Sequence, residues 1–458
     1  MNRTRTSLAY RGVRSAVAAL FVAFVTACSS LLDVKNPNNV NANDLDNPAA
    51  APAIANGALA TVAYGWGAIL LEYSTASDEL TWIGSRDGFR ELDVGTMTNP
   101  TNEFTDAAFP FIGRARWMSD FAIKQLSAFD SAGTLKNRDD LARAYLYAAI
   151  AYTMIGDMFN NFPIGSDRRV AAPPLGRAKM DSTYVVAIAY TTAGLAIAQA
   201  TGTKSLQLAL TAQRARAEHA KAVWGKVHPA GPGVPNGGSG IISDPAANAD
   251  AAAALALATV DWKYRFAYSS TTIDNSLGAW VNSRQEMRVG NAYINASTKD
   301  TLKDPITGLV DPELRRAAIE FKGTSASQLY GPLTVVSVRE LYLILAEAAL
   351  AAGDTLSATG QFAVNINAVR ALNGLPAYDP ANAAHPRPLA MLIYERKANL
   401  FLQGRRLHDL YRFGERADQW QTTTPIAEAV SAPGIFFPIT QIELLANPYC
   451  VADPTVCR

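Results

Sequence analysis

The sequence has almost no net charge, few cysteines and few histidines. Its 458 residues include 41 Lys+Arg and 40 Asp+Glu, which leaves a formal net charge of +1. That balance provides no domain-wide basic field to neutralise phosphates, so we expect no nucleic-acid partner. The four histidines and three cysteines are too scattered for metal-ligand spacing. We therefore expect no metal site.

Catalytic and nucleotide-binding motifs are also missing. The chain contains no H-E-x-x-H, no Walker loop, no G-x-S-x-G elbow and no G-x-G-x-x-G. The sequence therefore gives no evidence for a phosphate-binding loop or for a hydrolase nucleophile. Acid pairs such as Asp78-Glu79 occur, but glycoside hydrolysis needs two carboxylates placed across a bond, which a sequence cannot establish. We expect no cofactor and no enzymatic activity, with an all-α glycosidase as the less favoured alternative.

The N-terminus has the composition of a targeting segment. Four arginines among the first 14 residues precede an apolar stretch over 15–25 that is too short to span a bilayer. The stretch ends in Val25-Thr26-Ala27-Cys28, which resembles the bacterial lipobox. We predict a removed signal peptide over 1–27, lipidation of Cys28, and a tether over 28–51 that is rich in Asn, Asp and Pro. An ordinary secretory signal with an incidental Cys28 is the alternative.

The two remaining cysteines form an even pair near the C-terminus. Export to an oxidising compartment favours a disulfide between Cys450 and Cys457, and Asp453-Pro454 favours a turn between them. Two free thiols in a frayed tail are the alternative. No second apolar run approaches the roughly 20 residues of a membrane-spanning helix. We therefore expect a soluble body that is held to the membrane by lipid.

Apolar periodicity predicts a mainly helical body. Helices are expected over 137–156, 183–200, 211–225 and 250–258, and Ser337-Val338-Arg339-Glu340 is a capping box that begins another helix. A further helix over about 355–372 follows, and two helices in about 38 residues approach the tetratricopeptide period. We therefore expect helical pairs over 137–225 and 337–413. Asp311-Pro312 predicts a short helix. Alternation over 261–268 predicts a strand whose four aromatic residues face the core.

Four strings in the C-terminal third carry a family resemblance. SVRELYLILAEAALAAGD, INAVRALNGLP, YERKANLFLQGRRLHDLYRFG and FFPITQIELLANP follow one another in an order that resembles the RagB/SusD family of surface nutrient-uptake lipoproteins. DPELRR at 311–316 and SDELTW at 77–82 agree more weakly. The sequence departs from the family pattern at Gln403, where an acid is common, and at Thr440, where proline is common.

The residue pattern of the third string predicts one helix with a structural role. Its apolar stripe includes Leu392, Leu400 and Leu407, and we expect Arg396, Arg406 and Asp409 to pair at its edges. The string therefore identifies the family without marking a ligand site.

The resemblance implies a mainly α fold, a tetratricopeptide-like helical-repeat body of the SusD-like α/α superhelix type, over 52–458. Irregular loops and a few short strands would form the ligand-facing part. It further implies an outer-membrane lipoprotein, facing the cell exterior, that binds oligosaccharides or other oligomeric nutrients. Such a protein delivers its ligand to a SusC-like TonB-dependent transporter and catalyses nothing. A helical-repeat scaffold that assembles envelope proteins is the alternative.

Sugar binding requires flat aromatic faces and a few polar groups for the hydroxyls. We expect two loop-rich, ligand-facing parts, over about 64–110 and 261–336. The first provides Asp78, Trp82 and Arg86, and the second provides Trp280 between Asn275, Asn282 and Arg284. We predict stacking by Trp82 and Trp280 and hydrogen bonding from Asp78 and Arg86. The alternative is that the Trp82 segment belongs to the core or faces the transporter.

Overall fold

The computed structural model describes residues 42–166, 170–228, 240–321 and 325–457. The predicted signal peptide and the predicted lipidation site Cys28 lie outside these residues. The chain divides into two units, Met1–Ala50 and Ala51–Arg458. The described end of the first unit consists of two 3-10 turns, η1 (Ala42–Asp46) and η2 (Pro48–Ala50). The part of the predicted tether that the structure describes therefore consists mainly of 3-10 turns.

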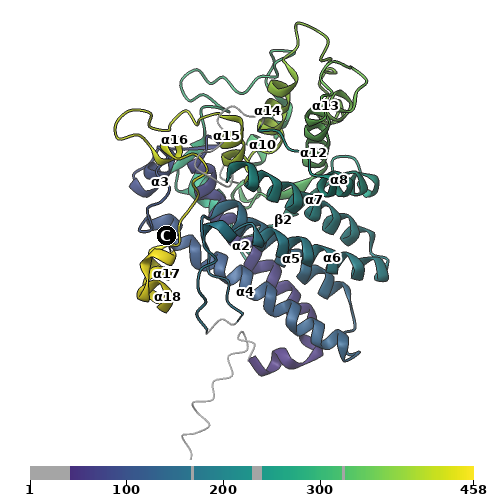
Figure 1. Cartoon of the computed structure of the whole chain (residues 1–458), viewed down its shortest axis with the longest axis vertical. Helices are drawn as coiled ribbons and strands as arrows, with labels where there is room; N and C mark the ends of the chain where they lie inside the picture. The colour runs from purple at the N-terminus through teal and green to yellow at the C-terminus, as the bar shows by residue number, and fades with distance from the viewer. Residues whose placement is uncertain (1–41, 167–169, 229–239, 322–324, 458) are drawn as a thin grey trace, which may run out of the picture. The chain divides into compact units, whose positions relative to one another are not determined.

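The second unit is mainly α, which confirms the predicted fold class (Figure 1). Its long helices pack in chain order, each against the next. They are α2 (Ala51–Ala76), α4 (Glu103–Ser131), α5 (Asp139–Met158), α6 (Ser182–Thr201), α7 (Lys204–Val227), α8 (Pro245–Leu257), α12 (Val338–Ala351) and α13 (Gln361–Leu372). A long connection over 159–181, with the short η3 (Arg177–Lys179), separates α5 from α6. Neighbouring helices bury one another's apolar faces, as in helical-repeat proteins.

Shorter elements lie between and after the long helices. The helical ones are α3 (Asp87–Asp93), α9 (Ser276–Gly278), the π-helix η4 (Ala279–Ser283), α10 (Pro312–Phe321), α11 (Ala326–Leu329), α14 (Pro388–Asn399), α15 (Arg406–Phe413), α16 (Glu428–Ser431), α17 (Gln441–Ala446), α18 (Pro448–Ala452) and η5 (Pro454–Cys457). Two antiparallel strand pairs join distant segments: β1 (Leu80–Trp82) with β3 (Met287–Val289), and β2 (Lys263–Phe266) with β4 (Leu333–Ser337).

The predicted helix starts at Ser337 and Asp311 are confirmed, although the Glu340 carboxylate accepts from Arg405 and does not complete the capping box. The Ser337 hydroxyl accepts a hydrogen bond from the backbone N of Glu340 at 3.4 Å, which begins α12. The Asp311 carboxylate accepts from the backbone N of Glu313 and of Leu314 at 2.9 and 3.0 Å, which begins α10. Side chains that satisfy the free N–H groups of a first turn are a local device, so the sequence alone reveals them.

The predicted strand and its aromatic face are also confirmed. Phe266 and Tyr268 are buried, and the half-buried Trp262 and Tyr264 pack against a core cluster from α7, α8, α12 and β4. An alternating strand thus turns its apolar face inward, as expected.

The segment 64–110 is mostly helical, which corrects the expectation of a ligand-facing loop region. Helix α2 buries 18 of its 26 residues, so it has no polar face and therefore no readable periodicity. Helix α4 contains Pro110, which ordinarily disrupts a helix interior. Packing of α4 against both α2 and α5 overrides this local preference, and Asn102 caps the helix by accepting from Phe104 N and Thr105 N.

Two helical stretches, Pro48–Ala76 and Arg177–Thr201, are long and apolar enough to cross a membrane by length and composition alone. The expectation that no further apolar run has this length was therefore wrong. The most apolar window of the first stretch is 67% buried inside the protein, as in a core helix of a soluble domain. Length and composition do not separate these two kinds of helix.

The third family string forms two helices, and the expectation of one continuous helix was wrong. Helix α14 ends at Asn399 and α15 begins at Arg406. In the turn between them Leu402 has φ of 54° and Gly404 has φ of 73°. A Cβ on Gly404 would lie 2.9 Å from Met158 Cε, so glycine permits both the backbone conformation and the close approach. The break separates the two helices, and both bury charged side chains in the interior.

Candidate functional site

Asp78 lies inside the protein, which corrects the expectation that it contacts ligand. Its side chain is buried, and its two carboxylate oxygens accept from Arg406 Nε and Nη2 at 2.7 and 2.8 Å. This two-point ion pair links the SDELTW segment to the start of α15. A carboxylate engaged in this way positions chain segments and is not available for sugar hydroxyls.

The neighbouring Glu79 makes a second link to the same region. It is fully buried, and its carboxylate accepts from Leu402 N at 2.6 Å and from Ser74 Oγ at 2.9 Å. Burial raises the pKa of Glu79 to about 8. The hydrogen bond to Leu402 N holds the turn in which that residue has a left-handed backbone. The SDELTW segment and the third family string are therefore joined by an ion pair and a hydrogen bond that hold them together in the fold.

The pairing of the buried arginines differs in part from expectation. Arg396 Nε donates to Asp409 Oδ2 at 2.9 Å, as predicted, whereas Arg406 pairs with Asp78 and with Glu415. The side chains of Arg396, Arg406, Asp409 and Asp78 are buried, and only Glu415 is partly exposed. The pairs therefore do not lie at an exposed helix edge.

Trp82 and Arg86 flank a short turn after β1. Trp82 is half-buried, lies opposite Met287 in the β1–β3 pair, and donates its backbone N–H to Asp93 Oδ2 at 3.1 Å. Arg86 is exposed, and its backbone N donates to Glu286 Oε2 at 3.0 Å across 200 residues of chain. A Cβ on Gly84 would lie 1.9 Å from that same oxygen, so only glycine allows the turn to close around the carboxylate.

Trp280 belongs to an aromatic cluster and not to a free loop, which corrects the expected environment. It lies in η4, and its ring packs edge-on against Phe89 and Phe104, with both centroid distances 5.2 Å. The exposed Arg284 places its guanidinium over the indole at 4.4 Å from the centroid, a cation–π contact. The sequence analysis did not select Arg284 for a role, although its spacing of four residues from Trp280 is a recognisable signal.

The structure thus brings Trp82, Arg86 and Trp280 to one region. The β1–β3 pair and Glu286 join the segment around 82–86 to the segment around 280–289. Asp78 is excluded from this surface because of its pairing with Arg406.

A groove of about 460 Å³ lies next to the aromatic cluster, between α3 and the start of α4. Its lining includes Asp87, Arg90 and Thr101, together with Glu91, which accepts from the amides of Asn99 and Asn102 at 2.9 and 2.7 Å. Phe89 and Phe104 directly follow the lining residues Gly88 and Glu103 in the chain. The sequence analysis missed these polar residues, because common residue types without a spacing pattern provide no signal.

A second groove, of about 520 Å³, lies between α4, residues 162–165 and 170–172, and α17. Trp117, Arg114 and Arg116 of α4 line it, with Ile442 and Glu443 of α17 opposite. Sequence analysis did not single out Trp117.

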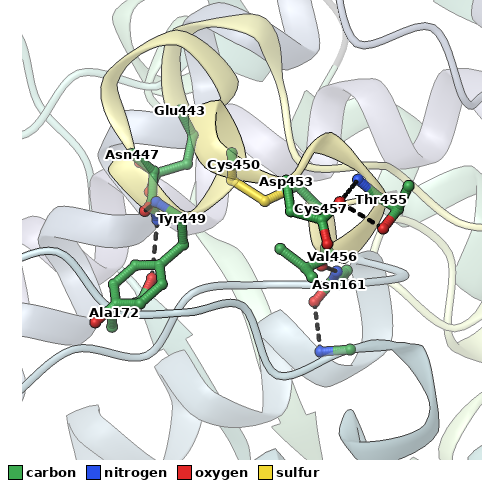
Figure 2. Close-up of a disulfide and its surroundings, with 11 residues drawn as sticks. Asn161, Ala172, Glu443, Asn447, Tyr449, Cys450, Asp453, Thr455, Val456 and Cys457 are labelled. Atoms are coloured by element: carbon green, nitrogen blue, oxygen red, sulfur yellow. Dashed lines mark hydrogen bonds between the residues drawn. A yellow bond between two sulfur atoms is a disulfide. The ribbon is translucent and has the colours of Figure 1, made fainter.

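The C-terminal tail that forms one wall of this second groove carries the Cys450–Cys457 disulfide, as Figure 2 shows. Asn447 Nδ2 donates to the carbonyl of Ala172 at 2.9 Å, and Asn161 Nδ2 donates to the carbonyl of Val456 at 3.0 Å. The bridge and these two hydrogen bonds hold α18 and η5 against the connection that follows α5.

Within the described parts of the chain, no group of three or more His, Cys, Asp or Glu side chains has an arrangement that could hold a metal ion. The groups that the candidate site presents are aromatic rings, amides, carboxylates and guanidinium groups.

Comparisons with known proteins agree with this architecture. The sequence model of the SusD family matches residues 324–433. No curated protein matches the chain in sequence. A SusD superfamily protein from Bacteroides fragilis has a TM-score of 0.61 at 13% identity, covering 88% of this chain and 98% of that chain. A SusD-like carbohydrate binding protein from Bacteroides vulgatus has a TM-score of 0.59 at 12% identity, covering 89% and 98%. A structure solved with a xylogluco-oligosaccharide has a TM-score of 0.59 at 12% identity, covering 88% and 98%.

Proposed function

Because the chain belongs to the RagB/SusD family, we propose that it is an outer-membrane lipoprotein that binds oligosaccharides and delivers them to a SusC-like TonB-dependent transporter. The family match over 324–433 and the fold support this proposal. One protein of the same fold is described as carbohydrate binding, and another was solved with a xylogluco-oligosaccharide. We expect the chain to bind its ligand without catalysing a reaction.

The observation that carries the proposed site is the assembly of Trp82, Arg86, Trp280 and Arg284 beside the polar groove. Trp280 and Arg284 form a half-exposed pair whose apolar and charged surfaces lie together. A sugar ring presents a C–H face that stacks on an indole and hydroxyls that accept from a guanidinium. The exposed side chains of Asp87, Arg90 and Thr101, which line the groove, provide further polar partners.

Several sugar units fit this arrangement better than one. The groove of about 460 Å³ is within the range of small-ligand sites, and Phe89 and Phe104, which contact Trp280, directly follow two of its lining residues in the chain. We therefore infer that the ligand is an oligosaccharide with one ring at Trp280 and others along α3.

A glycan array on the purified protein, followed by calorimetric titration of each hit, tests this function. Trp280→Ala removes the stacking face and should weaken binding by about 5- to 150-fold, which corresponds to roughly 1 to 3 kcal/mol. Arg284→Gln, at an exposed position, should weaken binding without disturbing the packing of the three rings. Thermal melts of both variants separate loss of binding from loss of folding.

Trp117→Ala is the matched control, because Trp117 is another half-buried tryptophan and lines the second groove, further along α4. It should leave affinity unchanged. The reverse pattern, with Trp117→Ala impaired and Trp280→Ala normal, would move the binding site to the second groove. No hit on the array with a well-folded protein would favour the scaffold alternative, and release of reducing ends from a hit would indicate a glycosidase.

Transport requires a partner, and a pull-down can test for one. Affinity purification of the tagged protein from detergent-solubilised outer membranes should recover a large TonB-dependent receptor. Recovery of other envelope proteins without such a receptor would contradict the transport role.

A further inference from the structure

A small cavity of about 20 Å³ lies in the interior, where α5, α7, α12, α14 and α15 meet. This volume has room for one water-sized particle. The cavity is lined mainly by charged and imidazole side chains: Asp157, Arg216, His219, Glu340, Arg396, Arg405, His408 and Asp409. All of these side chains are buried. Their hydrogen bonds must therefore be satisfied inside the protein or by whatever occupies the cavity.

The carboxylates around the cavity are already engaged. Asp157 accepts from Tyr184 Oη at 2.9 Å and from Arg216 Nη2. Both oxygens of Glu340 accept from Arg405, at 2.6 and 2.7 Å. Asp409 accepts from Arg396 Nε and from Arg412 Nε, at 2.9 and 2.8 Å. Each of these carboxylate oxygens thus has a donor.

Several donors around the same cavity remain unpaired. Among the described residues, Arg216 Nε and Nη1, Arg396 Nη1 and His408 Nε2 are buried without a hydrogen-bond partner. Arg396 Nη1 lies 3.7 Å from Glu347 Oε2, which is too long for a hydrogen bond. Leaving buried N–H groups unpaired is costly, and more so on charged groups.

The contacts of His408 with Tyr73 indicate which of its ring nitrogens carries the proton. The backbone N of His408 donates to Tyr73 Oη at 3.3 Å, and Tyr73 Oη lies 2.9 Å from His408 Nδ1. Among the described residues, Nδ1 is the only acceptor within reach of the buried tyrosine hydroxyl, so the hydroxyl donates its hydrogen to Nδ1 while it accepts from the backbone N–H. The neutral imidazole then carries its hydrogen on Nε2, so this nitrogen is a donor as well.

We propose that this cavity binds a single halide ion, chloride in the cell. Every unpaired group around it is an N–H donor, and a halide only accepts. A water molecule accepts from only two donors at once, whereas four unpaired donor nitrogens belong to side chains around this cavity, and a halide can accept from all of them. The carboxylates that pair with Arg216 and Arg396 leave N–H groups of both guanidiniums free, and the ion supplies the missing acceptor.

The ion would join helices that belong to different parts of the array. Arg216 lies on α7, Arg396 on α14 and His408 on α15, and their free N–H groups are all donors, which cannot hydrogen-bond to one another. A halide between them holds the turn after α14 against α7. Its role is positioning of the C-terminal helices, independent of the glycan surface at Trp280.

Crystals grown from or soaked in sodium bromide test the site directly. Diffraction at the bromine absorption edge should show an anomalous peak inside the cavity, within hydrogen-bond distance of Arg216 and His408. An anomalous map without a peak there, with ordinary density refining as water, would overturn the proposal.

Thermal melts at fixed ionic strength provide a second test. Replacing gluconate by bromide should raise the melting temperature by about 2 °C when bromide is present at ten times its dissociation constant. His408→Phe keeps a ring against Phe436, with centroids 4.4 Å apart in the native protein, but removes one donor. It should weaken bromide binding about tenfold.

His228→Phe is the matched control, because His228 contacts the same Phe436 at 5.6 Å and does not line the cavity. It should keep the full bromide effect. An unchanged bromide effect in His408→Phe would contradict the proposal, as would its loss in both variants. Should His408→Phe fail to fold, the anomalous diffraction of the native protein decides.

Discussion

Glu79→Gln should stabilise the protein above neutral pH, because it replaces a buried carboxyl by a neutral group of the same shape. Glu79 is fully buried and accepts from Leu402 N and from Ser74 Oγ. In the variant, the amide oxygen accepts from Leu402 N, and the amide nitrogen donates to the Ser74 hydroxyl. Neither partner is lost, so the substitution isolates the effect of the ionisable group.

The magnitude follows from the pKa of Glu79, which burial raises from 4.5 to about 8. The folded protein keeps this proton up to about pH 8, whereas the unfolded chain releases it near pH 4.5. The contribution of the protonated carboxyl to stability is therefore complete below pH 4.5 and is lost as the pH rises towards 8. At 1.36 kcal/mol for each pH unit, the full loss is about 4 to 5 kcal/mol.

Urea denaturation of the native protein and the variant at pH 5 and pH 8 measures this loss. The stability difference in favour of Glu79→Gln should be about 3 to 4 kcal/mol larger at pH 8 than at pH 5. Glu320→Gln, at an exposed position of α10, is the control and should show no such change. A stability difference that is the same at both pH values would refute the reasoning, because it would mean that Glu79 ionises normally in the folded state.

Three further predictions concern anchoring, the tail and the buried ion pair. Cys28→Ala should release the protein from membranes into the soluble fraction; retention after a high-salt wash, with an unmodified native N-terminus by mass spectrometry, would disprove lipidation. Intact-mass analysis should find the thiols of Cys450 and Cys457 only after reduction, and free thiols in fresh protein would remove the bridge. Asp78→Ala should cost about 3 kcal/mol of stability because the buried Arg406 loses its two-point partner and keeps only the partly exposed Glu415; lost glycan affinity in a well-folded, equally stable variant would return Asp78 to the ligand site.

Local signals in the sequence identified much of the helical body. The capping residues Ser337 and Asp311 mark the starts of α12 and α10, and period-two alternation marks the strand that contains Phe266. These signals depend on neighbours within one turn or one strand, so they are readable without a tertiary structure. The order of the family strings led to the fold class for the same reason, since it is a property of the chain alone.

Other features depended on contacts between distant segments. Helix α2 lacks a polar face because it is surrounded by protein, and α4 is helical through Pro110 because α2 and α5 pack against it. Aromatic and charged residues around 64–89 therefore suggested a loop where the chain is mostly helical. Burial on all sides removes the periodicity from which a helix is recognised.

The candidate site shows the same division. Tryptophan beside charged residues directed attention to Trp82, Arg86 and Trp280, which the β1–β3 pair brings to one region. Residue type could not show that Asp78 is held by Arg406, which lies 328 positions further along the chain. A carboxylate looks the same in a sequence whether it faces water or a buried guanidinium, and only the folded chain decides which of the two surrounds it.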